Sequence, residues 1–152
     1  MKLSTRSRYG VRLMIALAAA GRDKSVFLKD IAASEDISGK YLSLIVIPLR
    51  AAGLIRSIRG ARGGYVLARE PQDISLCDIV EAVEGKIDLV NCVKNPDVCP
   101  RAEACTARDT WTELSHTIRE AMGGVNLARL VTGQEGKKGI TRPKVRQIKK
   151  GS

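Results

Sequence analysis

Apolar side chains recur at helical spacing along the first third of the chain, and this pattern predicts three successive helices. The first begins near Ser4 or Thr5 and ends at Gly21, since glycine commonly stops a helix. The second covers about residues 28–34, and the third follows Ser38, whose hydroxyl is suited to capping its first turn. The inner stripe of the third helix comprises Leu42, Ile45, Val46 and Leu49.

The second and third helices, about residues 28–52, have the arrangement of a helix-turn-helix motif. In that motif the N-terminal residues of the second helix enter the major groove of DNA. Pro48 should kink or tighten this helix, because proline lacks a backbone N–H. The candidate contacts with bases or phosphates are Ser38, Lys40, Tyr41, Ser43 and Arg50.

Two short strands follow, at residues 54–58 and 65–67, and a glycine-rich connection joins them. This pattern predicts a β-hairpin wing over residues 54–68. Arg59, Gly60 and Arg62 at its tip are candidates for contact with a phosphate backbone or a narrow minor groove. A nucleotide site is not indicated, since neither GxxxxGK[ST] nor GxGxxG is present.

Charge is divided unevenly along the 152 residues. Residues 1–69 carry a net charge of +9, residues 70–135 carry −6, and residues 136–152 carry +7. A polyanion would be attracted to the first segment and to the tail, which favours double-stranded DNA as the partner. The tail from residue 134 lacks apolar periodicity and is expected to be disordered.

The composition limits the remaining classes of protein. Apolar residues make up 44% of the chain, with one Trp, one Phe and three Tyr, so the core should be aliphatic and mainly helical. No apolar run is long enough to span a membrane and no secretion signal is recognisable, so we expect a cytoplasmic protein. An enzyme is not expected, because no acid–base constellation accompanies the single histidine.

Three cysteines, Cys92, Cys99 and Cys105, lie in one polar stretch with the spacing C-x6-C-x5-C. In a reducing compartment such spacing indicates metal or redox chemistry rather than structural disulfides. Thiolates suit iron–sulfur clusters, zinc or copper, and a metal-free loop is a further alternative. Zinc is disfavoured because no CxxC pair is present. Cys77 lies in an apolar run and is expected to be buried.

A helix is predicted from about residue 103 to residue 122, followed by a short helix over residues 127–131 that Asn126 can cap. Spacings of three and four residues give the longer helix a coiled-coil-like seam. The seam is formed by Trp111, Leu114, Ile118, Ala121 and Val125. It favours a homodimer that reads a pseudopalindromic operator, although an intrachain core would give the same pattern.

Several stretches together resemble the iron–sulfur regulators typified by IscR, a family that includes NsrR-like and CymR-like members. They are MKLSTR at residues 1–6, RY at 8–9, LKDIA at 28–32, IS at 37–38, YL at 41–42, PLR at 48–50, AGL at 52–54, RG at 59–60 and RGGYVLA at 62–68. The resemblance extends from Met1 to about Gly133. It implies a winged helix-turn-helix, a long dimerisation helix and transcriptional control. Many members have Glu where this chain has Ser43, so operator preference is not carried over.

The resemblance also implies a fourth cluster ligand that this chain lacks. IscR-like members place a histidine three residues after the third cysteine, where this chain has Arg108. NsrR-like members use an acidic residue of the partner subunit, where this chain has Arg8. His116 lies too far along the predicted helix to ligate the same cluster and is expected at the surface or an interface. The remaining candidates are Asp97, Glu103, Asp109, a small thiol or an open iron site.

The sequence therefore predicts a mainly α protein, with a winged helix-turn-helix domain and a long C-terminal dimerisation helix. The expected divisions are residues 1–84 for DNA binding, 85–106 for the cysteine loop, 103–133 for dimerisation and 134–152 for the basic tail. The expected function is iron–sulfur, iron or redox sensing through a cluster, [2Fe-2S] in preference to [4Fe-4S], on Cys92, Cys99 and Cys105. The alternatives are a cluster-free regulator of sulfur metabolism that acts through a protein partner, and a small electron-transfer protein.

Overall fold

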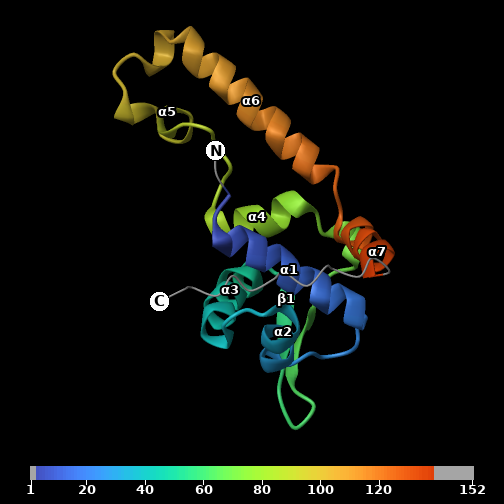
Figure 1. Cartoon of the computed structure of the whole chain (residues 1–152). Helices are drawn as coiled ribbons and strands as arrows, with labels where there is room; N and C mark the ends of the chain where they lie inside the picture. Colours follow the sequence, from blue (N-terminus) through green and yellow to red (C-terminus); the bar gives the residue numbers. More distant parts are fainter. Residues whose placement is uncertain (1–2, 139–152) are drawn as a thin grey trace, which may run out of the picture.

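The computed structural model describes residues 3–138, and its first helix has the predicted bounds. Helix α1 covers Thr5–Ala20, and Ser4 caps it by accepting hydrogen bonds from the backbone N–H groups of Arg6 and Ser7. Gly21 ends the helix at φ +97°, a conformation that side chains rarely allow. α1 lies at the centre of the molecule, with α3, α4 and α7 packed around it (Figure 1).

The predicted helix-turn-helix is confirmed. Helix α2 covers Leu28–Glu35, helix α3 covers Gly39–Ala51, and Asp36 turns the chain between them at φ +53°. The four residues of the predicted inner stripe of α3 are all buried. Pro48 does not end the helix, which continues through it to Ala51. The helix therefore forgoes only the hydrogen bond that the missing N–H of Pro48 would have donated.

The wing is a two-stranded antiparallel hairpin of β1, Ile55–Ile58, and β2, Gly64–Leu67. Ile55 pairs with Leu67, and Ile58 pairs with Gly64. The connection between α1 and α2 runs along the open edge of β2, where Val26 and Tyr65 exchange two backbone hydrogen bonds of 3.0 and 2.9 Å. Gly64 permits this approach, because a Cβ at that position would lie 2.5 Å from the carbonyl oxygen of Val26.

A 3-10 turn η1, Pro71–Asp73, leads to helix α4, Leu76–Glu84. Ser75 and Asp78 form a reciprocal capping box that fixes the start of α4. Aliphatic side chains from α1, α2, α3, α4 and the strands form one core, to which Leu127 at the start of the C-terminal helix also contributes. Its fully buried members include Leu13, Leu17, Ile31, Leu42, Ile45, Leu49, Leu54, Leu67 and Ile79.

The C-terminal half leaves this core and returns to it (Figure 1). Helix α5, Asn91–Lys94, and the 3-10 turns η2, Pro96–Val98, and η3, Ala102–Ala104, precede the long helix α6, Thr106–Gly123. The predicted long helix therefore begins a few residues later than expected, after η3. Helix α7, Leu127–Lys138, packs back on α1.

Asn126 caps α7 as predicted, accepting a hydrogen bond of 2.9 Å from the backbone N–H of Arg129. The helix is longer than the predicted residues 127–131 and includes residues 134–138, which the sequence assigned to a disordered tail. The rest of that predicted tail, residues 139–152, lies outside the described residues. No helix within residues 3–138 is long and apolar enough to cross a membrane.

Candidate nucleic-acid interface and cysteine loop

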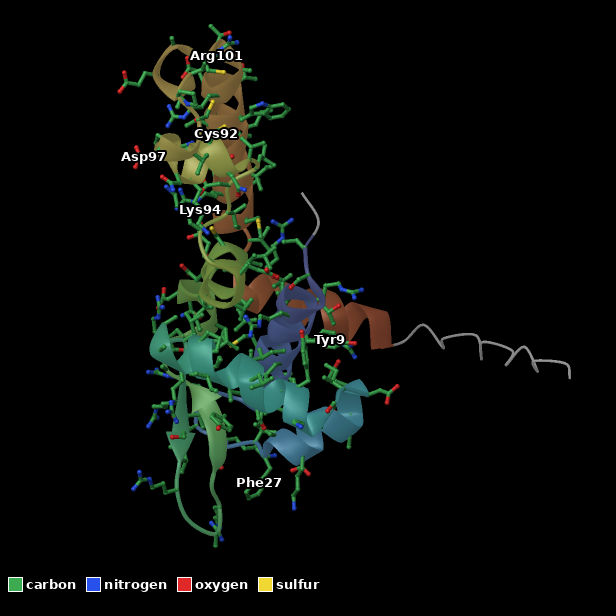
Figure 2. All side chains as sticks on the ribbon, turned by 90° about the vertical axis from the view of Figure 1, so that its left-hand side faces the viewer. Tyr9, Phe27, Cys92, Lys94, Asp97 and Arg101 are labelled. Carbon is green, nitrogen blue, oxygen red and sulfur yellow. The ribbon has the colours of Figure 1, made fainter. Side chains whose placement is uncertain are left out.

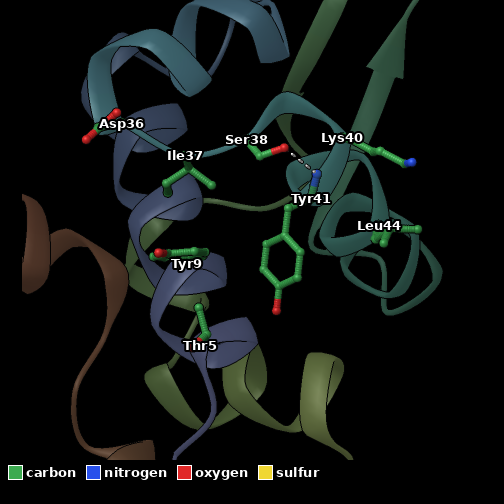
Figure 3. Close-up of a pocket in the computed structure, with 8 residues that line it drawn as sticks. All are labelled: Thr5, Tyr9, Asp36, Ile37, Ser38, Lys40, Tyr41 and Leu44. Carbon is green, nitrogen blue, oxygen red and sulfur yellow. Dashed lines mark hydrogen bonds between the residues drawn. The ribbon is translucent and has the colours of Figure 1, made fainter.

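The start of α3 carries half of the predicted DNA contacts. The hydroxyl of Ser38 accepts a hydrogen bond of 3.4 Å from the backbone N–H of Tyr41, which fixes the first turn (Figure 3). Ser38 and Lys40 are exposed there, and Arg50 is exposed in the last turn of the helix. These three polar side chains are therefore free to contact a ligand from the same helix.

Two other predicted contacts are already engaged within the chain. The Tyr41 ring is half-buried and packs edge-on against Tyr9, with the ring centroids 5.7 Å apart. The hydroxyl of Ser43 donates a hydrogen bond of 2.9 Å to the carbonyl oxygen of Gly39. Ser43 therefore remains exposed but can offer a ligand only an acceptor.

A groove opens between α1 and α3 beside these residues (Figure 3). Tyr9 and Tyr41 form part of its wall, while Lys40 and Leu44 point away from α1 on its outer side. Arg12 supports the α1 side, since its guanidinium lies 2.8 Å from a Glu35 carboxylate oxygen and 5.6 Å from the centre of the Tyr9 ring. The groove is thus continuous with the face of α3 that carries Lys40.

The wing presents its predicted residues at an exposed tip. Arg59, Gly60 and Arg62 are all exposed, and Gly60 adopts φ +102°. The carbonyl of Gly60 accepts a hydrogen bond of 2.9 Å from the N–H of Gly63, which closes the turn. The two arginines therefore project from a short, ordered connection.

A second hollow at the base of the wing brings two cationic residues that were not predicted as DNA contacts, Lys24 and Arg56, beside the predicted Arg62. Phe27 and the carboxylate-bearing Asp23 also line it. Lys24 comes from the connection between α1 and α2, and it reaches the wing because Val26 pairs with β2. In the sequence, Arg62 at the wing tip and Arg56, one charge within an otherwise uncharged strand, are the signals of this site.

The three predicted thiols lie on one loop but on separate elements. Cys92 is in α5, Cys99 follows η2, and Cys105 immediately precedes α6. Each is half-buried and unpaired. Figure 2 shows the labelled Cys92 at the end of the molecule opposite Phe27 and the wing. Cys92 and the wing therefore lie at opposite ends of the molecule.

The thiols have suitable chemistry for a cluster, but the loop does not gather them. Within residues 3–138, no group of three or more His, Cys, Asp or Glu side chains is placed to hold a metal ion. The candidate carboxylates Asp97, Glu103 and Asp109 are all exposed. The three expected thiols are therefore present in one loop, but within residues 3–138 they are not arranged around a common metal position.

Arg108, at the position where the resemblance implies a fourth ligand, binds the loop backbone. Its Nε donates a hydrogen bond of 2.9 Å to the carbonyl of Cys92, and one terminal nitrogen donates one of 3.5 Å to the carbonyl of Ala102. The buried hydroxyl of Ser115 binds the loop at a second point, accepting a hydrogen bond of 3.0 Å from the N–H of Leu89. Two side chains of α6 thus hold the loop.

The other titratable residues on or near α6 contact neighbouring side chains of the chain. His116 is exposed, as predicted, with its Nδ1 3.4 Å from a carboxylate oxygen of Glu120. Cys77 is half-buried rather than buried as predicted. Desolvation raises the pKa of the Cys77 thiol, and Glu81 raises it further while Arg119 opposes both. The Arg119 guanidinium lies 2.7 Å from a Glu81 carboxylate oxygen and ties α6 to α4.

The predicted seam of α6 is only partly covered within the chain. Trp111 and Leu114 are 41% and 43% exposed, so the N-terminal half of the seam is not an intrachain core. Ile118 is half-buried, Ala121 is exposed, and Val125 lies beyond the end of the helix.

Comparison with known proteins assigns the chain to a family. Residues 3–133 match the Rrf2 family, described as iron-dependent transcriptional regulators. Protein rrf2 of Nitratidesulfovibrio vulgaris is 40% identical over 131 residues, covering 86% of this chain and 87% of that protein. The regulator CymR of Bacillus subtilis is 38% identical over 136 residues, covering 90% and 94%. IscR of Xenorhabdus nematophila is 33% identical over 135 residues, covering 89% and 82%.

Solved structures agree with these relationships. The structure of CymR, the global cysteine regulator of B. subtilis, matches with a TM-score of 0.71 at 37% identity, covering 88% of this chain and 98% of that one. T. potens IscR matches with a TM-score of 0.71 at 31% identity, covering 94% and 93%. CymR and IscR are named transcriptional regulators and not enzymes. The chain therefore belongs to the Rrf2 family of winged-helix transcription regulators.

Proposed function

We propose that this Rrf2 regulator is a homodimer that binds a pseudopalindromic duplex and senses iron–sulfur, iron or redox status through Cys92, Cys99 and Cys105. In this proposal residues 1–84 read DNA, residues 85–106 form the sensing loop and residues 103–133 carry the dimer contact. The observation that carries it is the division of one chain into an exposed, basic reading surface and a remote loop with three half-buried, unpaired thiols.

DNA contact is supported by the exposed cations and the shape of the reading surface. Ser38, Lys40 and Arg50 on α3 and Arg59 and Arg62 on the wing would meet bases or phosphates. Lys24 and Arg56 extend the phosphate-binding surface to the base of the wing. Cations on two separated elements suit the major groove and the flanking backbone of one half-site.

Dimerisation is supported by the exposed part of the α6 seam. Trp111 and Leu114 are large apolar side chains that a second copy of α6 would cover. The helix is tied to α4 through the Arg119 and Glu81 pair, so a change in how two α6 helices pack would alter the position of the reading surface. A ligand would shift the equilibrium between two dimer arrangements only by binding one arrangement more tightly than the other.

The cysteine loop would hold the sensed group through its three thiolates, [2Fe-2S] in preference to [4Fe-4S]. A bound cluster would supply a centre whose assembly, loss or oxidation follows the supply of iron and the redox state. Because the thiols are not gathered within the described residues, cluster binding would require the side chains or the backbone of the loop to rearrange. The hydrogen bonds from Arg108 to the carbonyls of Cys92 and Ala102 would hold the backbone of the loop during that rearrangement.

The test is anaerobic purification followed by absorption and Mössbauer spectroscopy and native mass spectrometry. Replacing Cys92, Cys99 or Cys105 with Ala should abolish visible absorbance and change affinity for the chain's own promoter region in gel shifts. Cys77→Ala is the matched control and should leave the colour intact, because this thiol lies outside the loop. A colourless wild type that contains zinc would contradict cluster sensing.

A second candidate is a cluster-free regulator of cysteine or sulfur metabolism that acts through a protein partner. It is favoured by the similarity to CymR and by Arg108, which organises the loop through backbone carbonyls. In this case the purified chain would be colourless and free of iron, and still bind its promoter. An electron-transfer role would instead predict a coloured protein that binds no specific DNA.

A further inference from the structure

One face of α3 combines a cation with two exposed aliphatic side chains. Lys40, Ser43, Leu44 and Ile47 are exposed at helical spacings of three, one and three residues, which places them on one side of the helix. Leu44 is 50% exposed and Ile47 is 60% exposed. Neither is needed for the core, which is filled by the opposite stripe of the same helix.

This face offers few side-chain hydrogen-bond donors to a ligand. The single hydroxyl hydrogen of Ser43 is used within the helix, because it is donated to the carbonyl of Gly39. Tyr41 is turned toward Tyr9, so its ring does not share the outer face. Lys40 and the hydroxyl hydrogen of Ser38, whose oxygen caps the helix, are the remaining side-chain donors at the start of the helix. Beyond its first turn, the outer face that this helix can present to a base edge is mostly the apolar surface of Leu44 and Ile47.

The major groove offers one apolar group on a base edge, the 5-methyl group of thymine. We propose that Leu44 and Ile47 read thymine methyl groups, so that each operator half-site carries fixed T·A pairs opposite these side chains. The proposal rests on the proposed DNA binding and adds the chemistry of its sequence preference. Leu44 points the same way as Lys40, away from α1 (Figure 3).

Charge identifies DNA as the occupant of this face in preference to another protein. Lys40 precedes the two aliphatic residues on α3 and Arg50 follows them, both exposed. Residues 1–69 carry a net charge of +9, which suits a polyanion. Lys40 and Arg50 would bind phosphates on either side while Leu44 and Ile47 reach the groove floor.

The test uses the full chain, anaerobically purified, and duplexes selected by it from a random double-stranded library. Each thymine of the selected site is then replaced with deoxyuridine, which removes the methyl group and keeps the base pairing. Wild-type affinity should fall about fourfold at each contacted thymine, as expected for one methyl group lost from an apolar contact. Leu44→Ala should make at least one of these positions insensitive to the replacement, whereas Leu44→Met should retain the sensitivity.

The controls separate methyl reading from general binding and from folding. Arg50→Ala should weaken the thymine and uracil duplexes by the same factor, because it removes a phosphate contact only. Leu44 is exposed, so Leu44→Ala should keep the wild-type melting temperature and oligomeric state. A change in oligomeric state instead would assign this face to a protein interface and overturn the proposal.

Two results separate the inference from the proposed function. Specific DNA binding with equal affinity for thymine and uracil at every position would overturn methyl reading and leave DNA regulation standing. A selected site without a fixed thymine would do the same. Absence of binding to any duplex would overturn both.

Discussion

The reader domain, α1 to α4 with the wing, and the cysteine loop, residues 85–106, are held together in different ways. The reader domain has a continuous aliphatic core with many fully buried side chains. In the cysteine loop only Ile87 and Ala102 are buried apolar residues, and no helical element exceeds four residues. The loop depends instead on side chains of α6 that bind its backbone. The reader domain is therefore the more stable part, and the loop is the part that should open locally at a lower free-energy cost.

The largest expected effect is a loss of stability in the reader domain. Leu42→Ala removes a fully buried side chain and should lower the free energy of unfolding by about 2–5 kcal/mol. Val98→Ala, at a position 57% exposed in the cysteine loop, should change it by about 0.5 kcal/mol or less. Urea unfolding of both variants measures the two changes in the free energy of unfolding. Equal decreases would contradict the difference between the two regions and show that the loop unfolds together with the core.

The next effect is local to the cysteine loop. Arg108→Ala frees the carbonyls of Cys92 and Ala102 and should cost the loop about 1–3 kcal/mol of local stability. Amide hydrogen exchange should accelerate across residues 85–106 and stay unchanged in the reader domain. Arg101→Ala, which removes an exposed arginine from the same loop, is the control and should leave exchange as in the wild type.

Removing charge from the wing should affect binding without affecting the fold. Arg59→Ala or Arg62→Ala should weaken DNA binding, and each should reduce the slope of log affinity against log salt by about one. Lys86→Ala removes an exposed charge outside the reader domain and should leave the slope unchanged. An unchanged slope in either wing variant would remove that arginine from the DNA contacts.

The smallest effect concerns the last residue of the reader domain. Burial alone would raise the pKa of the Glu84 carboxyl, but hydrogen bonds from Ser4 and Ser7 outweigh it and lower the pKa. Because the pKa is lower in the folded state, ionised Glu84 stabilises the fold. This stabilisation is complete above the ordinary carboxyl pKa and is lost as the pH falls through the lowered value. It contributes about 0.5 kcal/mol or less to the free energy of unfolding, since the side chain is exposed.

Glu84→Gln tests this pH dependence. The difference in unfolding free energy between the wild type and the variant should be present at neutral pH and shrink in acid. A difference that stays constant with pH would show that the carboxylate charge does not contribute. The contact matters for the comparison because it joins α4 to the start of α1 at the point where the chain leaves for the cysteine loop.

The reader domain was predictable because local signals and burial agree there. Ser38 caps α3 and Gly21 ends α1, as their residue types predict. Leu42 and Ile45 are buried, as the helical periodicity predicts. The hollow at the wing base was not predictable, because Lys24 reaches Arg56 only through the pairing of Val26 with β2. Periodicity carries no information about such long-range pairing.

The cysteine loop was predictable as a set of residues and not as a structure. The spacing of Cys92, Cys99 and Cys105 indicated thiol chemistry, and the resemblance showed that Arg108 stands where a ligand was expected. That Arg108 bonds to two backbone carbonyls depends on how α6 lies against the loop. Side-chain bonds to backbone leave no repeating pattern in a sequence.

The contact between Gly64 and Val26 has a consequence for how this wing can evolve. Any side chain at residue 64 would force Val26 away, and Ser25 donates a further hydrogen bond of 2.6 Å to the carbonyl of Arg62. The wing is thus held to the connection between α1 and α2 at Gly64 and at the carbonyl of Arg62, whereas a Cβ at Gly60 in the tip would meet no atom within 4 Å. Lineages that acquire new operators would be expected to vary the charge of the tip while glycine is kept at residue 64.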